Sequence, residues 1–373
     1  MSIGVRGGCS SPFGRSPTRF RHGAPFRRRR GDTYNLANPD SVAEIRALSD
    51  SIQILVTALH LTAVNAAFSG PILALWLFLR SRRNQNGAVA DLGRSLLRGS
   101  LFGFYAGMAL GVVAALIWWG DHERAVERAF HALPIDRYYF TAAELIFSAV
   151  VLEAWAAFWR RNADHKTSRN NALMIGLAVV GITNTVYHFP SLFTVLAVLS
   201  TRIPAGEERF VSLLIDPEVI ARIAHFALAS FAVGGAMLAA LAAARRFETA
   251  DDDEVAPPMF ALQRNGALIA LIATLLQWPV GILVVLQLPE ASRDALMGQN
   301  AVVTVLFAIS LCAVVMLMHR MAAAAFGRVS PAEMRSLLLW LGITIMLMTA
   351  VRHFSRAPLY DAVAHQILHQ TVS

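Results

Sequence analysis

Apolar residues occur along the chain in long runs, and clusters of charged or polar residues separate one run from the next. Each run has about 20 residues or more, the length that an α-helix needs to cross the hydrocarbon core of a bilayer. A helix also satisfies its own backbone polar groups, as lipid requires. The pattern therefore predicts eight transmembrane helices, at residues 51–79, 99–119, 138–159, 171–200, 218–243, 261–288, 300–321 and 335–352.

Composition agrees with this prediction. Of the 373 residues, 55% are hydrophobic and only 16% are charged, whereas a soluble domain carries about a quarter charged residues. We expect an all-α polytopic membrane bundle over residues 45–360, with a short C-terminal tail at 361–373. Residues 1–44 are basic, rich in Arg, Pro and Gly and without an apolar period, which predicts a disordered segment. The expected partner is the lipid bilayer and not nucleic acid.

Positive charge is distributed unevenly over the predicted loops. It concentrates in the first, third and seventh connections, at Arg80, Arg82, Arg83, Arg94, Arg98, Arg160, Arg161, Lys166, Arg169, Arg320, Arg328 and Arg335. Short cytoplasmic loops of membrane proteins carry the excess of Lys and Arg. We therefore predict that these three loops lie inside, that both termini lie outside, and that the protein resides in the inner (cytoplasmic) membrane.

Five ionisable side chains interrupt the apolar runs. Counted from the predicted outer ends at about 1.5 Å per residue, all five fall in the outer half of the bilayer. They are His60, Glu144, His188, His225 and His353. Ionisable groups inside a membrane are costly and tend to mark functional sites. Their shared depth on five helices predicts one prosthetic site or a group of such sites.

Haem suits these residues better than zinc or copper. Cys9 lies in the N-terminal segment and Cys312 is alone in the seventh span, so thiolate ligands are missing, whereas haem iron accepts axial imidazole. Gly, Ala and Phe in 101–120 and 225–238 would line a porphyrin pocket, although small residues also serve close helix packing. No Cys-x-x-Cys-His occurs, so the haem would be bound noncovalently.

Two stretches resemble subunit I of cytochrome bd quinol oxidase. SIQILVTALHLTAVNAAFSGP, residues 51–71, is similar to the first helix of that family, and RIAHFALASFAVGGAML, residues 222–238, is similar to the fifth. The resemblance extends over residues 45–360 with degenerate motifs. It implies that His225 is an axial ligand of a b-type haem and that His60 is an axial ligand in a second haem site.

Weaker similarities lie in two other spans. Glu144 and Glu153 are nine apart, where the family has two acidic residues near its high-spin haems and proton path. VRHFSRAPLY, residues 351–360, is similar to the end of the family's eighth helix. The resemblance implies that Arg352 and Arg356 pair with haem propionates.

The chain also departs from the family. The long outward quinol-binding loop is missing, and residues 288–299 stand in its place, with Arg293 where the family has a lysine. The Met that pairs with the fifth-helix histidine has no clear counterpart, and a ninth helix is absent. His353 stands where the family has a ligating Glu. Quinol oxidation is therefore in question, and the fifth-helix histidine needs another partner.

Several roles stay open at this point. His188 is a candidate second ligand beside His225, although Pro190 after it equally suits a helix kink. His353 is a candidate ligand with or instead of His60, or a histidine at the membrane interface. Asn184 is expected to bond a neighbouring helix.

The two carboxylates also have alternatives. Glu144 is a ligand or proton donor near a haem. Glu153 is either a relay for cytoplasmic protons or a side chain that reaches out to Arg160 or Arg161.

We expect a membrane-embedded electron-transfer protein with one to three haems. The haems would be of type b, and other haem types remain open. Electrons would pass between quinol, a periplasmic c-type cytochrome or a second membrane subunit and a haem near the outer face. If one haem keeps an open position, the chain is an oxidoreductase that reduces oxygen, as a terminal oxidase subunit does. Two alternatives are a haem-free proton or cation transporter or channel, and a cofactor-free membrane anchor subunit of a redox complex.

Overall fold

The computed structural model describes residues 39–162, 168–201, 209–248, 255–327 and 329–372. Most of the predicted disordered segment, together with Lys166 and Arg328 of the basic loops, lies outside the described residues. The chain divides into two compact units, Met1–Ile45 and Arg46–Ser373. In the first unit the described residues form the beginning of a helix, and all contacts given below lie within the second.

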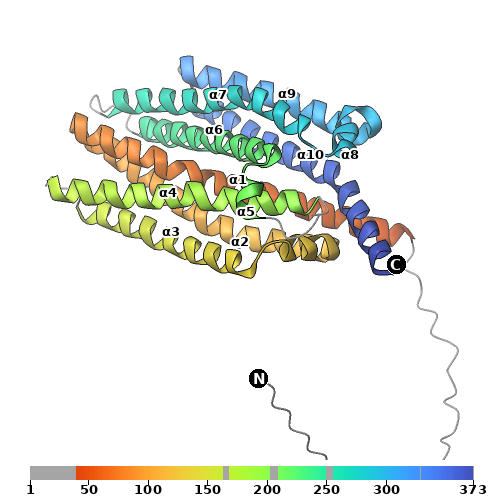
Figure 1. The fold of residues 1–373 in the computed structure, drawn as a ribbon. Coiled ribbons are helices and arrows are strands. Elements are labelled where there is room, and N and C mark those ends of the chain that lie inside the picture. Colours follow the sequence, from red (N-terminus) through yellow and green to blue (C-terminus); the bar gives the residue numbers. More distant parts are fainter. Residues whose placement is uncertain (1–38, 163–167, 202–208, 249–254, 328, 373) are drawn as a thin grey trace, which may run out of the picture. The chain divides into compact units, whose positions relative to one another are not determined.

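Eight helices are long and apolar enough to span a membrane (Figure 1). They are α1 (Pro39–Asn84), α2 (Gly87–His131), α3 (Ile135–Arg161), α4 (Ser168–Leu199), α6 (Pro217–Glu248), α7 (Ala256–Leu286), α9 (Ala301–Phe326) and α10 (Pro331–Val372). The predicted all-α polytopic membrane bundle with eight spans is confirmed. Each helix is longer than its apolar run, because the helical backbone continues into the polar flanks, and α10 runs on through the predicted C-terminal tail.

Short helical elements occupy two of the predicted outer loops. They are α5 (Phe210–Leu214), α8 (Glu290–Asp294) and the π-helical turn η1 (Ala295–Gln299). Gly298 in this turn has a φ of 122°, a conformation that only glycine adopts at low cost. In α2 the helical path breaks at His122, where φ is −136° and ψ is 40°, so the last turns of α2 form a separate segment beyond the span.

Small residues bring α1 close to both α2 and α6. A Cβ on Gly103 of α2 would lie 2.8 Å from a carbonyl oxygen of α1, and a Cβ on Gly234 of α6 would lie 2.2 Å from Ser69 Oγ. These approaches leave no room for a side chain at either glycine. Ser230 Oγ of α6 donates a hydrogen bond of 2.8 Å to Asn65 Oδ1 of α1, which fixes the register of the two helices.

The remaining helices complete the bundle around this centre. α6 and α7 pack so closely that a Cβ on Gly235 would lie 2.6 Å from the Gly266 carbonyl oxygen. α9 and α10 cover this pair through a core that includes Met321 and Leu337, both almost fully buried. On the other side, α3 packs against α4, and buried aromatic and aliphatic residues of α3 join those of α1 and α2 in a second core.

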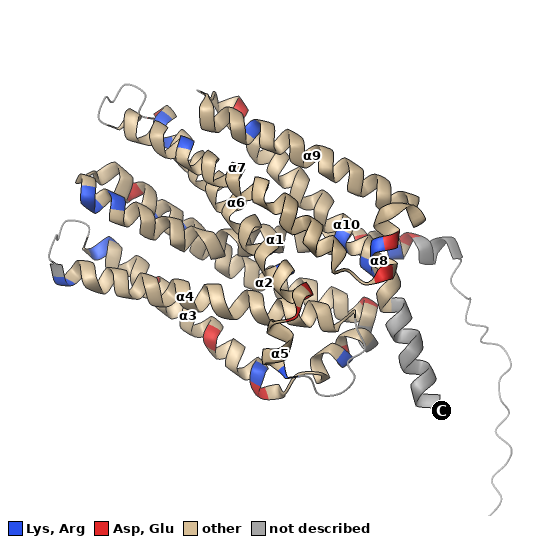
Figure 2. Ribbon diagram, turned by 45° about the horizontal axis from the view of Figure 1, so that its top comes forward, with Lys and Arg blue, Asp and Glu red and all other residues tan. Residues whose placement is uncertain are grey.

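Charged residues are distributed as a membrane environment requires. Figure 2 shows Lys and Arg gathered at the end of the bundle where α1 meets α2 and α3 meets α4, with few charged residues along the middle of the helices. This is the end that the loop charges predict to be cytoplasmic. The eight spans, with few charged residues along their middle, describe an integral membrane protein.

Candidate functional site

His60 of α1 is held against α2 by a hydrogen bond. Its Nδ1 lies 2.8 Å from the carbonyl oxygen of Gly107. A carbonyl oxygen only accepts, so Nδ1 carries the proton and Nε2 keeps a free lone pair. Metal-ligating histidines usually have this arrangement, in which a carbonyl or carboxylate fixes the second ring nitrogen. A Cβ on Gly111 would lie only 2.9 Å from His60 Cε1, so the glycine makes room for the ring.

His225 of α6 is an imidazole without an evident structural task. Its Nδ1 is buried and has no hydrogen-bond partner in the described part of the protein. An unpaired buried polar atom is destabilising. Because Nδ1 makes no hydrogen bond to a neighbouring helix, such a bond does not explain why a histidine occupies this position. The ring lies beside α7, where a Cβ on Gly281 would be 3.9 Å from His225 Cε1.

The two histidines lie at the same level of the bundle. Ser230 of α6 is hydrogen-bonded to Asn65 of α1. Four residues further along each helix, Gly234 of α6 faces Ser69 of α1. Both helices therefore run in the same direction. His60 precedes Asn65 by five positions and His225 precedes Ser230 by five positions. Both histidines therefore lie about 7.5 Å from the bonded pair, toward the predicted outer face.

A buried ion pair lies one turn from His225. Arg222 is paired with Glu218, whose side chain is only 1% exposed. A charge pair in this position is costly unless its polar atoms are well satisfied, and Arg222 Nε has no partner within the described residues. Sequence reasoning missed both residues, although the Glu-x-x-x-Arg spacing places them on one helix face.

His353 of α10 is fixed by a carboxylate. Its Nε2 lies 2.9 Å from Asp50 Oδ1 at the start of the α1 span. This bond occupies Nε2, the ring nitrogen that usually binds iron. A role for His353 as an axial ligand therefore stays a prediction, and it requires the hydrogen bond to Asp50 to break. Asp50 carries no sequence signal for this role, because it lies 303 residues away from its partner.

Three buried polar atoms without a hydrogen-bond partner in the described part of the protein lie at the predicted outer ends of α1, α2 and α10. Arg356 is 4% exposed, and its Nη2 has no partner within the described residues. Gln53 Oε1 and Trp118 Nε1 are also buried and have no hydrogen-bond partner within the described residues. The Trp118 ring lies 6.1 Å from the ring of Tyr360, and Tyr360 is one turn beyond Arg356 on α10. A buried, unpaired guanidinium fits an anionic group such as a haem propionate. Arg352, the other candidate, is exposed.

The candidates on α3 and α4 have contacts between these two helices. The His188 ring packs against Phe140 of α3, with 5.4 Å between ring centroids, and its pairing with His225 on one haem stays a prediction. Asn184 Nδ2 donates to the backbone oxygen of Glu144, at 3.0 Å, and to Ser148 Oγ, at 2.8 Å. The expected bond from Asn184 to a neighbouring helix is thus confirmed, and it fixes the backbone of α3 at the Glu144 position.

Glu153 has a tyrosine partner. Tyr105 Oη of α2 donates to Glu153 Oε1 at 3.2 Å, and no ion pair links Glu153 to Arg160 or Arg161 among the described side chains. The alternative in which Glu153 reaches the basic loop is therefore not seen. Sequence analysis did not single out Tyr105.

Arg293, at the position of the quinol-loop lysine, is part of a helix and not of an extended loop. It lies in α8, where the neighbouring Ser292 Oγ donates to the Ser355 carbonyl oxygen of α10 at 2.7 Å. The segment between α7 and α9 therefore packs on the predicted outer end of α10, next to Arg356.

The imidazole and guanidinium side chains described above can be compared with what a haem requires. Within the described residues, no three His, Cys, Asp or Glu side chains converge as a metal site would require. Haem needs only one or two axial side chains, because the porphyrin supplies the other iron ligands. His60, His225 and the buried Arg356 are the residues that fit such a group.

Comparison with known proteins adds one finding. No protein-family model matches the chain, and no curated protein matches it in sequence. Among solved structures, the bd oxidase from Geobacillus thermodenitrificans matches with a TM-score of 0.57 and 13% identity, over 84% of this chain and 87% of that chain. The chain has a bd oxidase fold. The similarity of fold extends over most of the bundle.

Proposed function

We propose that this protein is a membrane-embedded b-type haem protein that transfers electrons, similar in role to subunit I of a bd oxidase. The observation that carries the proposal is the hydrogen bond from His60 Nδ1 to the Gly107 carbonyl, which leaves Nε2 free as a ligand. The bd oxidase fold supports it. When bound, haem supplies an iron centre that gains and loses single electrons and, with an open axial position, binds oxygen.

Each residue of the site has a separate task in this proposal. His60 holds one haem and His225 another, at one level of the bundle. The Gly107 carbonyl fixes the tautomer and orientation of His60, and Gly111 leaves space for the His60 ring. Arg356, helped by Arg352, neutralises propionates at the outer end. His188 and His353 are the candidates for second axial ligands.

A proton route along α3 accompanies this role. Glu153, bonded to Tyr105, takes protons from the basic end of the bundle, and Glu144 releases them near a haem. The two carboxylates are nine residues apart, which is roughly 13.5 Å along a helix, so transfer between them needs intervening water. The proposal places the protein in the inner membrane with both termini outside, beside a second membrane subunit.

The electron donor follows from the helix that replaces the quinol loop. Because α8 and η1 are short and packed on α10, they offer no extended loop for a quinol, and we propose a periplasmic c-type cytochrome or the second subunit as donor. When oxidised protein is mixed anaerobically with a reduced c-type cytochrome or with a soluble quinol, the cytochrome should reduce the haem at least about tenfold faster. Equal or faster reduction by the quinol would show that the missing loop is dispensable and refute this choice of donor.

A further inference from the structure

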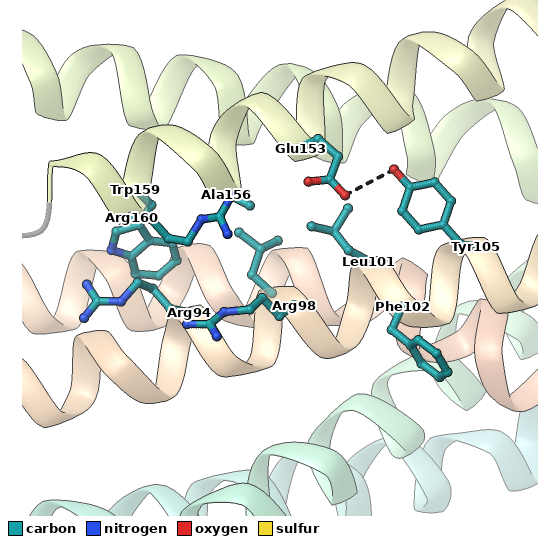
Figure 3. A pocket seen from close by; sticks show the side chains of 10 residues that line it. Arg94, Arg98, Leu101, Phe102, Tyr105, Glu153, Ala156, Trp159 and Arg160 are labelled. Atoms are coloured by element: carbon teal, nitrogen blue, oxygen red, sulfur yellow. Dashed lines mark hydrogen bonds between the residues drawn. The ribbon is translucent and has the colours of Figure 1, made fainter.

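A pocket of about 270 Å³ opens between α2 and α3, near the basic end of the bundle (Figure 3). Three arginines line it: Arg94 and Arg98 from α2 and Arg160 from α3. One carboxylate, Glu153, lies deeper in the same pocket. Neither His60 nor His225 lines it, so the pocket is separate from the proposed haem sites.

The mouth of this pocket carries positive charge that the protein does not neutralise. Arg94 is paired with Asp91. Arg98 and Arg160 are exposed and have no hydrogen bond or ion pair with another described residue. Glu153 is seven positions from Arg160, about 10 Å deeper along the helix, where it accepts the Tyr105 hydrogen bond. Two free guanidinium groups at one opening favour an anion with several oxygen atoms, such as a phosphate.

The walls of the pocket are apolar below the arginines. Leu101, Ala156 and Trp159 line it and are buried, and Phe102, which is 76% exposed, borders it on the outer surface of α2. Both helices span the membrane, so these side chains continue into the hydrocarbon region. A water-soluble anion would gain nothing from them, whereas hydrocarbon chains attached to the anion would bury apolar surface.

We propose that this α2–α3 arginine pocket binds the phosphate headgroup of an anionic phospholipid of the inner leaflet. Arg98 and Arg160 contact the phosphate, and the acyl chains lie along Phe102. Basic pockets between transmembrane helices at the cytoplasmic side bind headgroups of this kind. A zwitterionic lipid brings an ammonium group close to the guanidinium groups, so it binds more weakly. The inference does not depend on haem.

The test is a lipid titration of the purified, delipidated full-length protein by native mass spectrometry. Phosphatidylglycerol and phosphatidylcholine with the same acyl chains are the two probes, and inorganic phosphate is the third. Phosphatidylglycerol should bind at least about tenfold more tightly than phosphatidylcholine. Arg98→Gln and Arg160→Gln should each weaken it roughly fivefold, and the double variant about thirtyfold, because each substitution removes one direct charge-assisted contact with the phosphate.

A double variant of Arg83→Gln and Arg161→Gln is the matched control. Both of its arginines are exposed at the same end of the bundle, Arg161 is adjacent to Arg160, and neither lines the pocket. Binding to this control should stay within about twofold of wild type. Equal affinity for the two lipids, or equal losses in pocket and control variants, would overturn the proposal. Displacement of the lipid by millimolar phosphate would also overturn it, since the site would then be one for a soluble anion.

Discussion

Replacement of His60 by alanine is expected to remove one haem per chain from the purified protein. The substitution deletes the imidazole whose Nε2 is kept free by the Gly107 hydrogen bond, and methyl groups do not bind iron. The pyridine haemochrome content should fall by one haem per chain, and one component of the reduced-minus-oxidised α-band should disappear. Elution as a single species in detergent would establish that the variant is folded.

The matched control is His131→Ala. His131 has the same side chain and lies toward the same end of the bundle, but it is 81% exposed, so its loss should leave haem content unchanged. If the folded His60→Ala protein keeps the wild-type spectrum and haem content, His60 is not an axial ligand. Its hydrogen bond would then be only a contact between α1 and α2.

Replacement of His225 gives the second large effect, and two variants separate ligation from packing. His225→Ala should lose one haem per chain, a different one from that lost with His60. His225→Met should keep that haem with a raised midpoint potential, because methionine is itself an axial ligand that raises the potential relative to histidine. Haem content and a spectroelectrochemical titration are the measurements.

A structural role for His225 would give another pattern. Alanine and methionine would then alter stability, through the cavity or the lost packing, without a shift in potential. Unchanged haem content in the folded His225→Ala variant would also count against ligation at this position.

The sequence was sufficient to predict the eight spans, because apolar runs of this length have few alternatives to a membrane helix. It was not sufficient for the ends of these helices. The α1 and α2 helices continue well beyond their runs, since Arg and Asn residues are tolerated in a helix once it leaves the bilayer. The segment between α7 and α9, expected as a remnant of a loop, forms α8 and a π-helical turn.

The common level of His60 and His225 was predictable, and the direction in which the candidate ligands point was not. Counting residues along α1 and α6 places His60 and His225 at one level, and the Asn65–Ser230 bond agrees with it. The side of a helix on which a residue faces its neighbour depends on packing between helices that are distant in sequence. For that reason the His188 ring against α3 and the Asp50 partner of His353 were not foreseen.

Unpaired polar atoms could not be found from sequence at all. The resemblance of residues 351–360 to a family motif led us to expect that Arg356 pairs with a propionate. Its burial and its unpaired Nη2 are properties of the assembled bundle. Gln53 and Trp118 gave no signal, because each is an ordinary residue at the end of a span. All three lie at the predicted outer ends of α1, α2 and α10, and their lack of partners among the described residues is seen only in the folded bundle.

The central claim is that this bundle carries haem, and a dithionite-reduced minus oxidised absorption spectrum of the wild-type protein tests it most directly. The protein is to be purified in detergent from cells supplied with ample haem and its natural partner subunit. We expect an α-band of reduced haem b, with a pyridine haemochrome value of at least about one haem per chain. A featureless spectrum from such protein would contradict the proposed function and favour a haem-free transporter or a cofactor-free anchor.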